Sequence, residues 1–173
     1  MSRRTIATAA AVTLALTAAA PAALARHACQ SPAELAAMQF RQLQIEFMVA
    51  TLKCDGTGYD YRGQYAAFLH KAEPAMATNA RALRAMFVRE GKGAGYIDHY
   101  LTGMSNDVQI RSQSADNYCQ AAAESFDRAT ALSPHELPGY AAQAVAAPYA
   151  ATPCPATHEA ARGHRHKRKL ASR

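Results

Sequence analysis

Four cysteines, at positions 29, 54, 119 and 154 of the 173-residue chain, are the first candidates for chemistry. Cysteine thiolates bind metals or exchange disulfides, and both tasks favour close pairs such as Cys-x-x-Cys. The spacing here is wide and the number of cysteines is even. We therefore expect Cys29, Cys54, Cys119 and Cys154 to form two structural disulfides, which are typical of an exported protein.

The densest group of metal-binding and charged side chains lies near the C-terminus. His158, His164 and His166 carry imidazoles that suit Ni²⁺, Cu²⁺ or Zn²⁺. The neighbouring basic side chains suit phosphate, anionic lipid or an acidic polymer instead: Arg165, Lys167, Arg168 and Lys169. These positive charges repel a metal cation, and apolar residues are scarce in this segment. The first interpretation is therefore a disordered, solubilising tail over residues 156–173. Metal binding and contact with an anionic surface are the alternatives.

Single ionisable residues in the body of the chain are weaker candidates. Glu46 stands between Ile45 and Phe47 on an apolar helical pattern, where burial would perturb a carboxyl group. Asp98 and His99 are adjacent, and adjacent residues on a helix do not face each other. We expect Glu46 at the edge of the apolar stripe, and His70 and His99 on the surface.

No motif in the chain predicts an enzyme. His-Glu-x-x-His, Gly-x-Ser-x-Gly, the P-loop and Gly-x-Gly-x-x-Gly are all missing, and no cofactor is implied. The glycine-rich stretch from Gly91 to Gly95 follows a helical pattern rather than a strand, so it predicts a helix-ending loop. Tyrosines are frequent, and a cleft between helices lined by them would suit a small apolar or aromatic ligand.

The first 25 residues predict a cleaved secretory signal. Arg3 and Arg4 precede an uncharged run rich in Ala, Val and Leu, and Ala23-Leu24-Ala25 is a small-x-small cleavage site. The run is too short and too weakly apolar for a membrane span, and no other segment of the sequence is long and apolar enough. General secretion and the twin-arginine route both fit. Loss of Arg3 and Arg4 lowers the net charge from +6 to +4.

The elements that must position these residues are helices. Ser31, Pro32 and Glu34 predict a capped start for a helix from 32 to about 53. Two adjoining apolar stripes run along it, one through Leu35, Met38, Ile45, Val49 and Leu52, the other through Ala36, Phe40, Leu43, Phe47 and Ala50. Two stripes make a wide apolar face, as expected of a central bundle helix.

Further helical patterns follow Tyr59, Ile97 and Ala115, and no segment alternates with the period of a strand. Pro74 interrupts the pattern after Tyr59, so that stretch is either one kinked helix or two helices. From Pro134 the chain becomes rich in Pro and Ala. We expect a helical domain over 26–133 and an extended arm over 134–155 that carries Cys154.

Helix geometry excludes one of the three disulfide pairings. A helix from 32 to 53 is about 33 Å long, whereas bonded cysteines need Cα atoms within about 7 Å, so Cys29 does not reach Cys54. Cys54–Cys119 with Cys29–Cys154 fits a continuous second helix. Cys29–Cys119 with Cys54–Cys154 fits a chain that reverses at Pro74. The first pairing is favoured, and the second stays open.

The sequence thus predicts an all-α protein, a four- to five-helix bundle stapled by two disulfides, located in a periplasm or outside the cell. Its expected role is non-enzymatic binding to an unknown envelope component, not to nucleic acid. The alternative is a small-ligand or transition-metal binding protein that uses tyrosine-lined helices or the histidine-rich tail. A polar cleft joining two or more of Glu46, His70, Asp98 and His99 would favour an enzyme, and an exposed apolar groove would favour a binding module.

Overall fold

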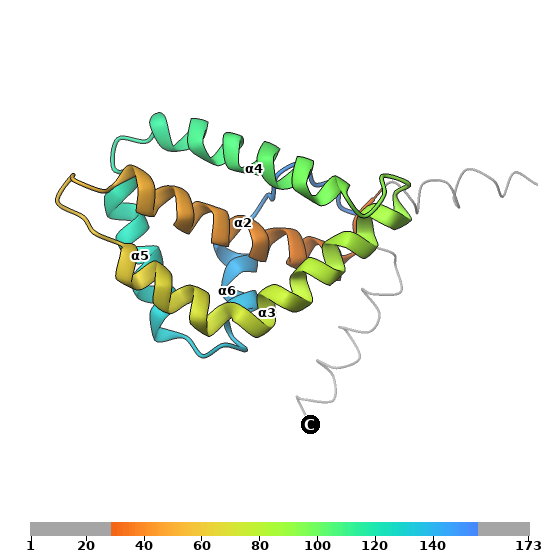
Figure 1. The fold of residues 1–173 in the computed structure, drawn as a ribbon, viewed down its shortest axis with the longest axis horizontal. Coiled ribbons are helices and arrows are strands. Elements are labelled where there is room, and N and C mark those ends of the chain that lie inside the picture. Colours follow the sequence, from red (N-terminus) through yellow and green to blue (C-terminus); the bar gives the residue numbers. More distant parts are fainter. Residues whose placement is uncertain (1–28, 156–173) are drawn as a thin grey trace, which may run out of the picture.

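The computed structural model describes residues 29–155, which form five α-helices and no strands. Figure 1 shows α2 in the middle, α4 along one side of it and α3 along the other. Within 29–155, no helix combines the length and apolar character needed to cross a membrane. The helices are α2 (Pro32–Lys53), α3 (Arg62–Arg89), α4 (Tyr96–Gln113), α5 (Tyr118–Ala131) and α6 (Leu137–Ala144). The predicted all-α bundle is confirmed.

The central helix α2 begins with the capping box that its sequence predicts. The Ser31 hydroxyl accepts from the backbone N–H of Glu34 at 3.4 Å, and the Glu34 carboxylate accepts from the backbone N–H of Ser31 at 2.8 Å. These bonds satisfy two of the amide groups that the first turn of a helix leaves without partners. The helix ends at Lys53, and the following Cys54 is fully buried.

The two apolar stripes of α2 enter two separate cores. Phe40, Leu43, Phe47 and Ala50 pack with α3, α5 and α6, where the Phe47 ring stacks on Phe126 with centroids 4.2 Å apart. Met38, Ile45 and Val49 pack with α4 and the C-terminal half of α3. One prediction is wrong at the end of the stripe that contains Met38, Ile45 and Val49: Leu52 is 73% exposed, because the partner helices do not cover this last turn.

The helix α3 is continuous and holds Pro74 inside it. Figure 1 shows it bent near its middle. The half before Pro74 places Phe68 and Ala72 in the core with α5, and the half after it places Leu83, Met86 and Phe87 in the core with α4. A proline removes one backbone hydrogen bond and bends a helix, so one helix serves both cores.

Two disulfides close opposite ends of the bundle: Cys54–Cys119 and Cys29–Cys154. This is the favoured pairing, and it follows from the continuity of α3. Cys54 ends α2 and Cys119 lies in the first turn of α5, so both fall at one end of the molecule. No cysteine is free. Two such bonds indicate that the chain folds in an oxidising compartment outside the cytoplasm.

The segment expected to be an extended arm, 134–155, is partly helical. Residues Leu137–Ala144 form α6, with Pro138 in the first turn, where a missing amide hydrogen costs nothing. Leu137 and Ala141 of α6 are buried beside α2. The prediction missed this helix because it took the prolines as signs of an extended chain. After Val145 the chain passes through bends and a turn at Tyr149 and Ala150, and crosses α2 to reach Cys154.

Candidate functional site

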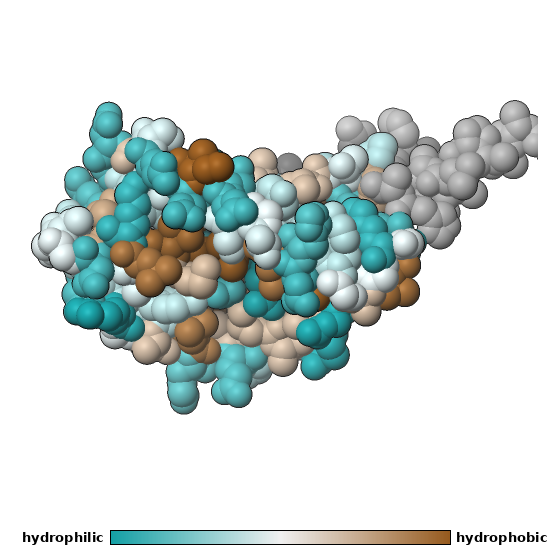
Figure 2. All heavy atoms as spheres, turned by 45° about the horizontal axis from the view of Figure 1, so that its top comes forward, coloured by the Kyte–Doolittle hydropathy of each residue, from teal (hydrophilic) through white to brown (hydrophobic). Residues whose placement is uncertain are grey.

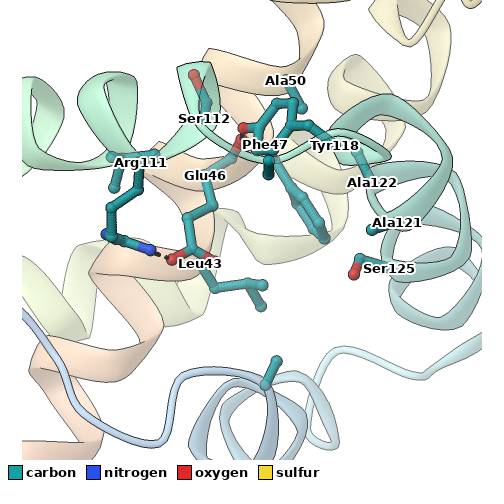
Figure 3. A pocket seen from close by; sticks show the side chains of 13 residues that line it. Leu43, Glu46, Phe47, Ala50, Arg111, Ser112, Tyr118, Ala121, Ala122 and Ser125 are labelled. Atoms are coloured by element: carbon teal, nitrogen blue, oxygen red, sulfur yellow. Dashed lines mark hydrogen bonds and ion pairs between the residues drawn. The ribbon is translucent and has the colours of Figure 1, made fainter.

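A cleft of about 410 Å³ opens between α4 and α5, with α2 as its floor (Figure 3). It exists because α4 and α5 both pack against α2 but scarcely against each other. Apart from Tyr118, the side chains that α5 turns toward the opening are small, so they do not fill it: Ala121, Ala122 and Ser125. The floor is apolar and consists of Leu43, Phe47 and Ala50, each at most 2% exposed.

An ion pair between α2 and α4 borders this cleft. One terminal nitrogen of Arg111, Nη2, lies 3.5 Å from Oε1 of Glu46. Each group has a firmer contact on its own helix: Arg111 Nε donates to Asp107 at 2.9 Å, and Gln42 Nε2 donates to Glu46 Oε1 at 2.9 Å. Neighbours thus hold the two charges in place. Glu46 lies at the edge of its apolar stripe and its side chain is 28% exposed, as predicted.

The phenol of Tyr118 forms the upper part of the cleft as Figure 3 shows it. Burial, and then the negative charge of Glu46, raise the pKa of Tyr118 to about 12. Its hydroxyl donates to the backbone oxygen of Glu46 at 3.5 Å, and the Lys53 ammonium lies 5.0 Å from the ring centre. The phenol is therefore neutral near pH 7 and serves as a hydrogen-bond donor, not as a base.

Several polar atoms of the cleft have no partner among residues 29–155. These are Oε2 of Glu46, Nη1 of Arg111 and the hydroxyl of Ser125. The lining contains no histidine and no cysteine, and no base lies beside Ser125 to activate it as a nucleophile. This set of groups can hold a charged, partly apolar ligand.

The other ionisable residues that the sequence singled out lie elsewhere. His70 and His99 are exposed, as expected, and so is Asp98; none of the three lines the cleft that contains Glu46. The His99 ring lies beside that of Tyr96, with ring centroids 5.1 Å apart and the ring planes tilted by 53°. Glu46 and His99 line separate cavities, and neither of these two cavities contains another of the four candidates for acid–base chemistry.

The tyrosines do not line one common cleft. Tyr96, Tyr100 and Tyr149 surround a cavity of only about 60 Å³ with Phe87, whereas pockets for small organic ligands measure about 300–1,000 Å³. Tyr61 packs on Phe126 at the far end of the bundle. Tyr118 borders the cleft of about 410 Å³, and it also lines, together with Tyr59, an opening of about 340 Å³ beside the start of α5.

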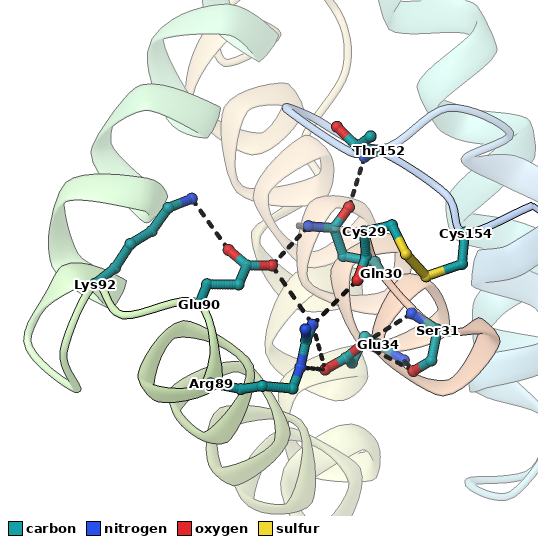
Figure 4. Close-up of polar contacts among 9 residues, drawn as sticks. All are labelled: Cys29, Gln30, Ser31, Glu34, Arg89, Glu90, Lys92, Thr152 and Cys154. Carbon is teal, nitrogen blue, oxygen red and sulfur yellow. Dashed lines mark hydrogen bonds and ion pairs between the residues drawn. A yellow bond between two sulfur atoms is a disulfide. The ribbon is translucent and has the colours of Figure 1, made fainter. Parts of the chain in front are cut away.

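A polar network that the sequence did not predict joins the ends of the domain (Figure 4). The Glu90 side chain is only 6% exposed, and its carboxylate accepts from Gln30 at 2.7 Å and contacts Lys92 at 3.1 Å. Arg89 binds Glu34 at 2.9 Å. Gln30 also accepts, through its side-chain oxygen, from the backbone N–H of Thr152. The network fastens the disulfide-bonded arm to α3.

A second, larger opening is an apolar groove of about 610 Å³ beside α2. Its lining has no carboxylate, lysine or arginine, so no charge selects an occupant. Residues of α2, α3 and the connection before α6 line it: Ala33, Ala36, Ala37, Phe40, Pro74, Ala75, Thr78, Asn79, Ala82, Pro134, His135 and Pro138.

A smaller apolar depression surrounds the exposed Leu52, between α2 and α4, together with Met48 and Val49. Figure 2 shows hydrophobic surface gathered on the half of this face where α2 and α4 end.

The proposed ligands of the tail lie outside the described residues. This holds for the histidines His158, His164 and His166 and for the basic residues Arg165, Lys167, Arg168 and Lys169. Between residues 29 and 155, no group of three or more histidine, cysteine or acidic side chains is placed to hold a metal ion. Arg111 is the main site residue that the sequence analysis missed, although its i, i+4 spacing from Asp107 was a visible signal. No family model, curated protein or solved structure matches this chain.

Proposed function

We propose that the protein is an exported, non-enzymatic binding protein of the cell envelope, and that the cleft between α2, α4 and α5 is its ligand site. The observation that carries the proposal is the composition of that cleft: an apolar floor, a charged edge and about 410 Å³ of open space. Concave sites that are mostly apolar, with a few convergent polar groups, are typical of small-molecule binding. The absence of a nucleophile with its base in the cleft favours binding over catalysis.

Export rests on separate observations. The signal-type segment over residues 1–25 supports it, and so do the two disulfides. The test is an intact mass of the protein from its native host, with and without reduction. We expect a chain that begins at Arg26 and gains about 4 Da on reduction, one hydrogen per cysteine. A retained N-terminus with four free thiols would contradict export.

Binding in the cleft is tested by nuclear magnetic resonance with small fragments as probes, p-cresol and phenylacetate. We expect both to shift backbone amide signals of Glu46, Val108 and Ala122, and to shift them far less in an Ala122→Trp variant, whose indole occupies the cleft. Ala121→Trp fills the same space from a more exposed position, should the first variant fold poorly. Ala67→Trp, on the exposed face of α3, is the matched control. Equal shifts in all four proteins would exclude the cleft as the site.

A further inference from the structure

The charged edge of the cleft is an incomplete ion pair. The separation of 3.5 Å between Arg111 Nη2 and Glu46 Oε1 exceeds the 2.7–2.9 Å of a charge-assisted hydrogen bond. Among residues 29–155, one group of each charge also has no partner: Nη1 on Arg111 and Oε2 on Glu46. Asp107 and Gln42 hold the two side chains, so both remain in position when the contact between them opens.

An apolar surface adjoins this pair of opposite charges. Figure 3 shows Arg111 and Glu46 directed at one another on one side of the Phe47 ring, with Ser125 on the opposite side. Leu43 lies beneath Glu46, and Ala122 forms part of the far wall. Phe47 itself is only 2% exposed, so a molecule that meets both charges places its apolar group against the accessible side chains of α5, Tyr118 and Ala122.

Building on the proposed function, we propose that the cleft binds a small zwitterion with an apolar side group, the chemistry of an apolar α-amino acid. Its ammonium binds Oε2 of Glu46, its carboxylate binds Nη1 of Arg111, and its side group lies against Tyr118 and Ala122. The ligand carboxylate then lies beside the guanidinium of Arg111, and the ligand ammonium lies beside the carboxylate of Glu46. Each protein charge thus gains a close partner of opposite sign.

The neighbouring charges favour a zwitterion over a singly charged ligand. A plain carboxylate on Arg111 would lie near two other carboxylates, those of Glu46 and Asp107, and would therefore bind more weakly than a carboxylate accompanied by an ammonium. A plain ammonium on Glu46 would lie near the guanidinium and leave Nη1 unused. A zwitterion has no net charge and meets both groups, so removing either of its charges removes a charged hydrogen bond.

The experiment compares L-phenylalanine with its two analogues that lack one charge each, 3-phenylpropanoate and 2-phenylethylamine, by calorimetry and amide shifts. We expect L-phenylalanine to bind at least about tenfold more tightly than either analogue. Glu46→Gln should weaken L-phenylalanine about tenfold and leave 3-phenylpropanoate no weaker. Arg111→Met should weaken L-phenylalanine similarly and leave 2-phenylethylamine no weaker. Glu124→Gln and Arg128→Met, exposed on α5, are the matched controls.

The outcomes separate this inference from the proposed function. If one analogue binds as tightly as L-phenylalanine while still shifting the amides of the cleft, the site is real but the zwitterion proposal is overturned. If L-phenylalanine binds and neither Glu46→Gln nor Arg111→Met weakens it, the assignment of its two charged groups is wrong. If none of the three compounds, nor p-cresol or phenylacetate, shifts the amides of the cleft, the proposed function fails as well.

Discussion

Lys71 illustrates how one charged residue can hold two helices together. Its ammonium donates to the backbone oxygens of Ala129, Thr130 and Leu132, the last of them 2.7 Å away. These carbonyls end α5, where the helix has no amide donors left to offer them. A positive charge at this end is also attracted to the negative end of the helix dipole. Lys71 on α3 therefore acts as a cap for α5.

Replacing Lys71 with Met should therefore destabilise the fold, because the apolar stem stays and the three hydrogen bonds are lost. We expect the free energy of unfolding to fall by about 1–3 kcal/mol. Chemical denaturation followed by circular dichroism measures the change. Arg81→Met is the control, since Arg81 is exposed on the same helix and its side chain donates only to Thr78. Equal losses in the two variants would contradict a capping role for Lys71.

Glu34 predicts how stability responds to acid. Partial burial raises its pKa, but hydrogen bonds from Ser31 and the charge of Arg89 outweigh burial and hold the pKa of Glu34 below the usual 4.5. A carboxyl group whose pKa is lower in the folded protein adds stability above its unfolded pKa. That stability is lost as the pH falls below 4.5 toward the folded pKa.

Glu34→Gln should remove this pH-dependent part of the stability. We expect its denaturation midpoint to fall less steeply than that of the wild type as the pH is lowered from 4.5. At neutral pH the variant should be the less stable of the two. Glu73→Gln, at an exposed position of α3, should keep the wild-type slope. Parallel profiles of denaturation midpoint against pH for wild type and Glu34→Gln would show that the Glu34 carboxyl does not contribute to the pH dependence of stability.

At the scale of residues, the sequence identifies side chains but not their distant neighbours. Glu46 was a candidate because it interrupts an apolar stripe, and the capping box of Ser31 and Glu34 was predictable because all its members are local. The partner of Glu46 is Arg111, 65 positions away, and only the packing of α4 against α2 brings them together. Lys71 and Glu90 were missed for the same reason.

At the scale of elements, two helical glycines differ in what surrounds them. A Cβ atom added to Gly103 in α4 would collide with the hydroxyl of Tyr149 and lie 3.0 Å from ring atom Cζ. No atom lies within 4 Å of the same position at Gly139 in α6. Tyr149 belongs to the arm after α6, so the missing side chain at Gly103 makes room for the arm.

Gly139→Ala should stabilise the protein by about 0.5–1 kcal/mol, the usual gain in a helix interior. Gly103→Ala has the same intrinsic gain but must displace Tyr149, so we expect no stabilisation and faster hydrogen exchange at the Gln30–Thr152 backbone bond. Thermal melting and exchange measured by mass spectrometry test the pair. A similar gain in both variants would show that the arm does not depend on this contact.

The elements followed from local patterns where those patterns were unambiguous. The stripes of α2 predicted a helix with a wide buried face, and the structure divides that face between two cores. Leu52 fits its stripe but lies beyond the cover of the other helices, and coverage is a tertiary property. The patterns left Pro74 ambiguous because proline fits both the first turn and the bend of a helix. The sequence patterns did not predict α6, because its eight residues include a proline and a glycine.

At the scale of the whole molecule, the two disulfides close chain segments of different length. Their sequence separations are 125 for Cys29–Cys154 and 65 for Cys54–Cys119. In the loop-closure description, each bond lowers the conformational entropy of the unfolded chain. It thereby raises the free energy of unfolding by about 4 kcal/mol or slightly more. The pairing could be narrowed from the sequence because the length of α2 excludes one arrangement, but choosing between the other two required the course of α3.

Removing each pair of cysteines should lower the free energy of unfolding by about 4 kcal/mol, with different local effects. Cys29→Ala with Cys154→Ala should speed hydrogen exchange in the arm, while the α5 signals stay as in the wild type. Cys54→Ala with Cys119→Ala should loosen α5 and the buried surroundings of Cys54. Denaturant titration and residue-level exchange provide both readouts. The same hydrogen-exchange pattern in both double variants would contradict separate roles of the two disulfides in holding the arm and α5.

The Cys29–Cys154 bond has a mechanical consequence. All five helices lie between these two cysteines, so a tension applied to the chain before Cys29 and after Cys154 runs through the sulfur bridge. The helices between them carry none of that load while the bond is intact. A tether attached at both ends of the domain would then meet a short covalent link with almost no extension. After reduction, the same tether would pull directly on the bundle and unravel it.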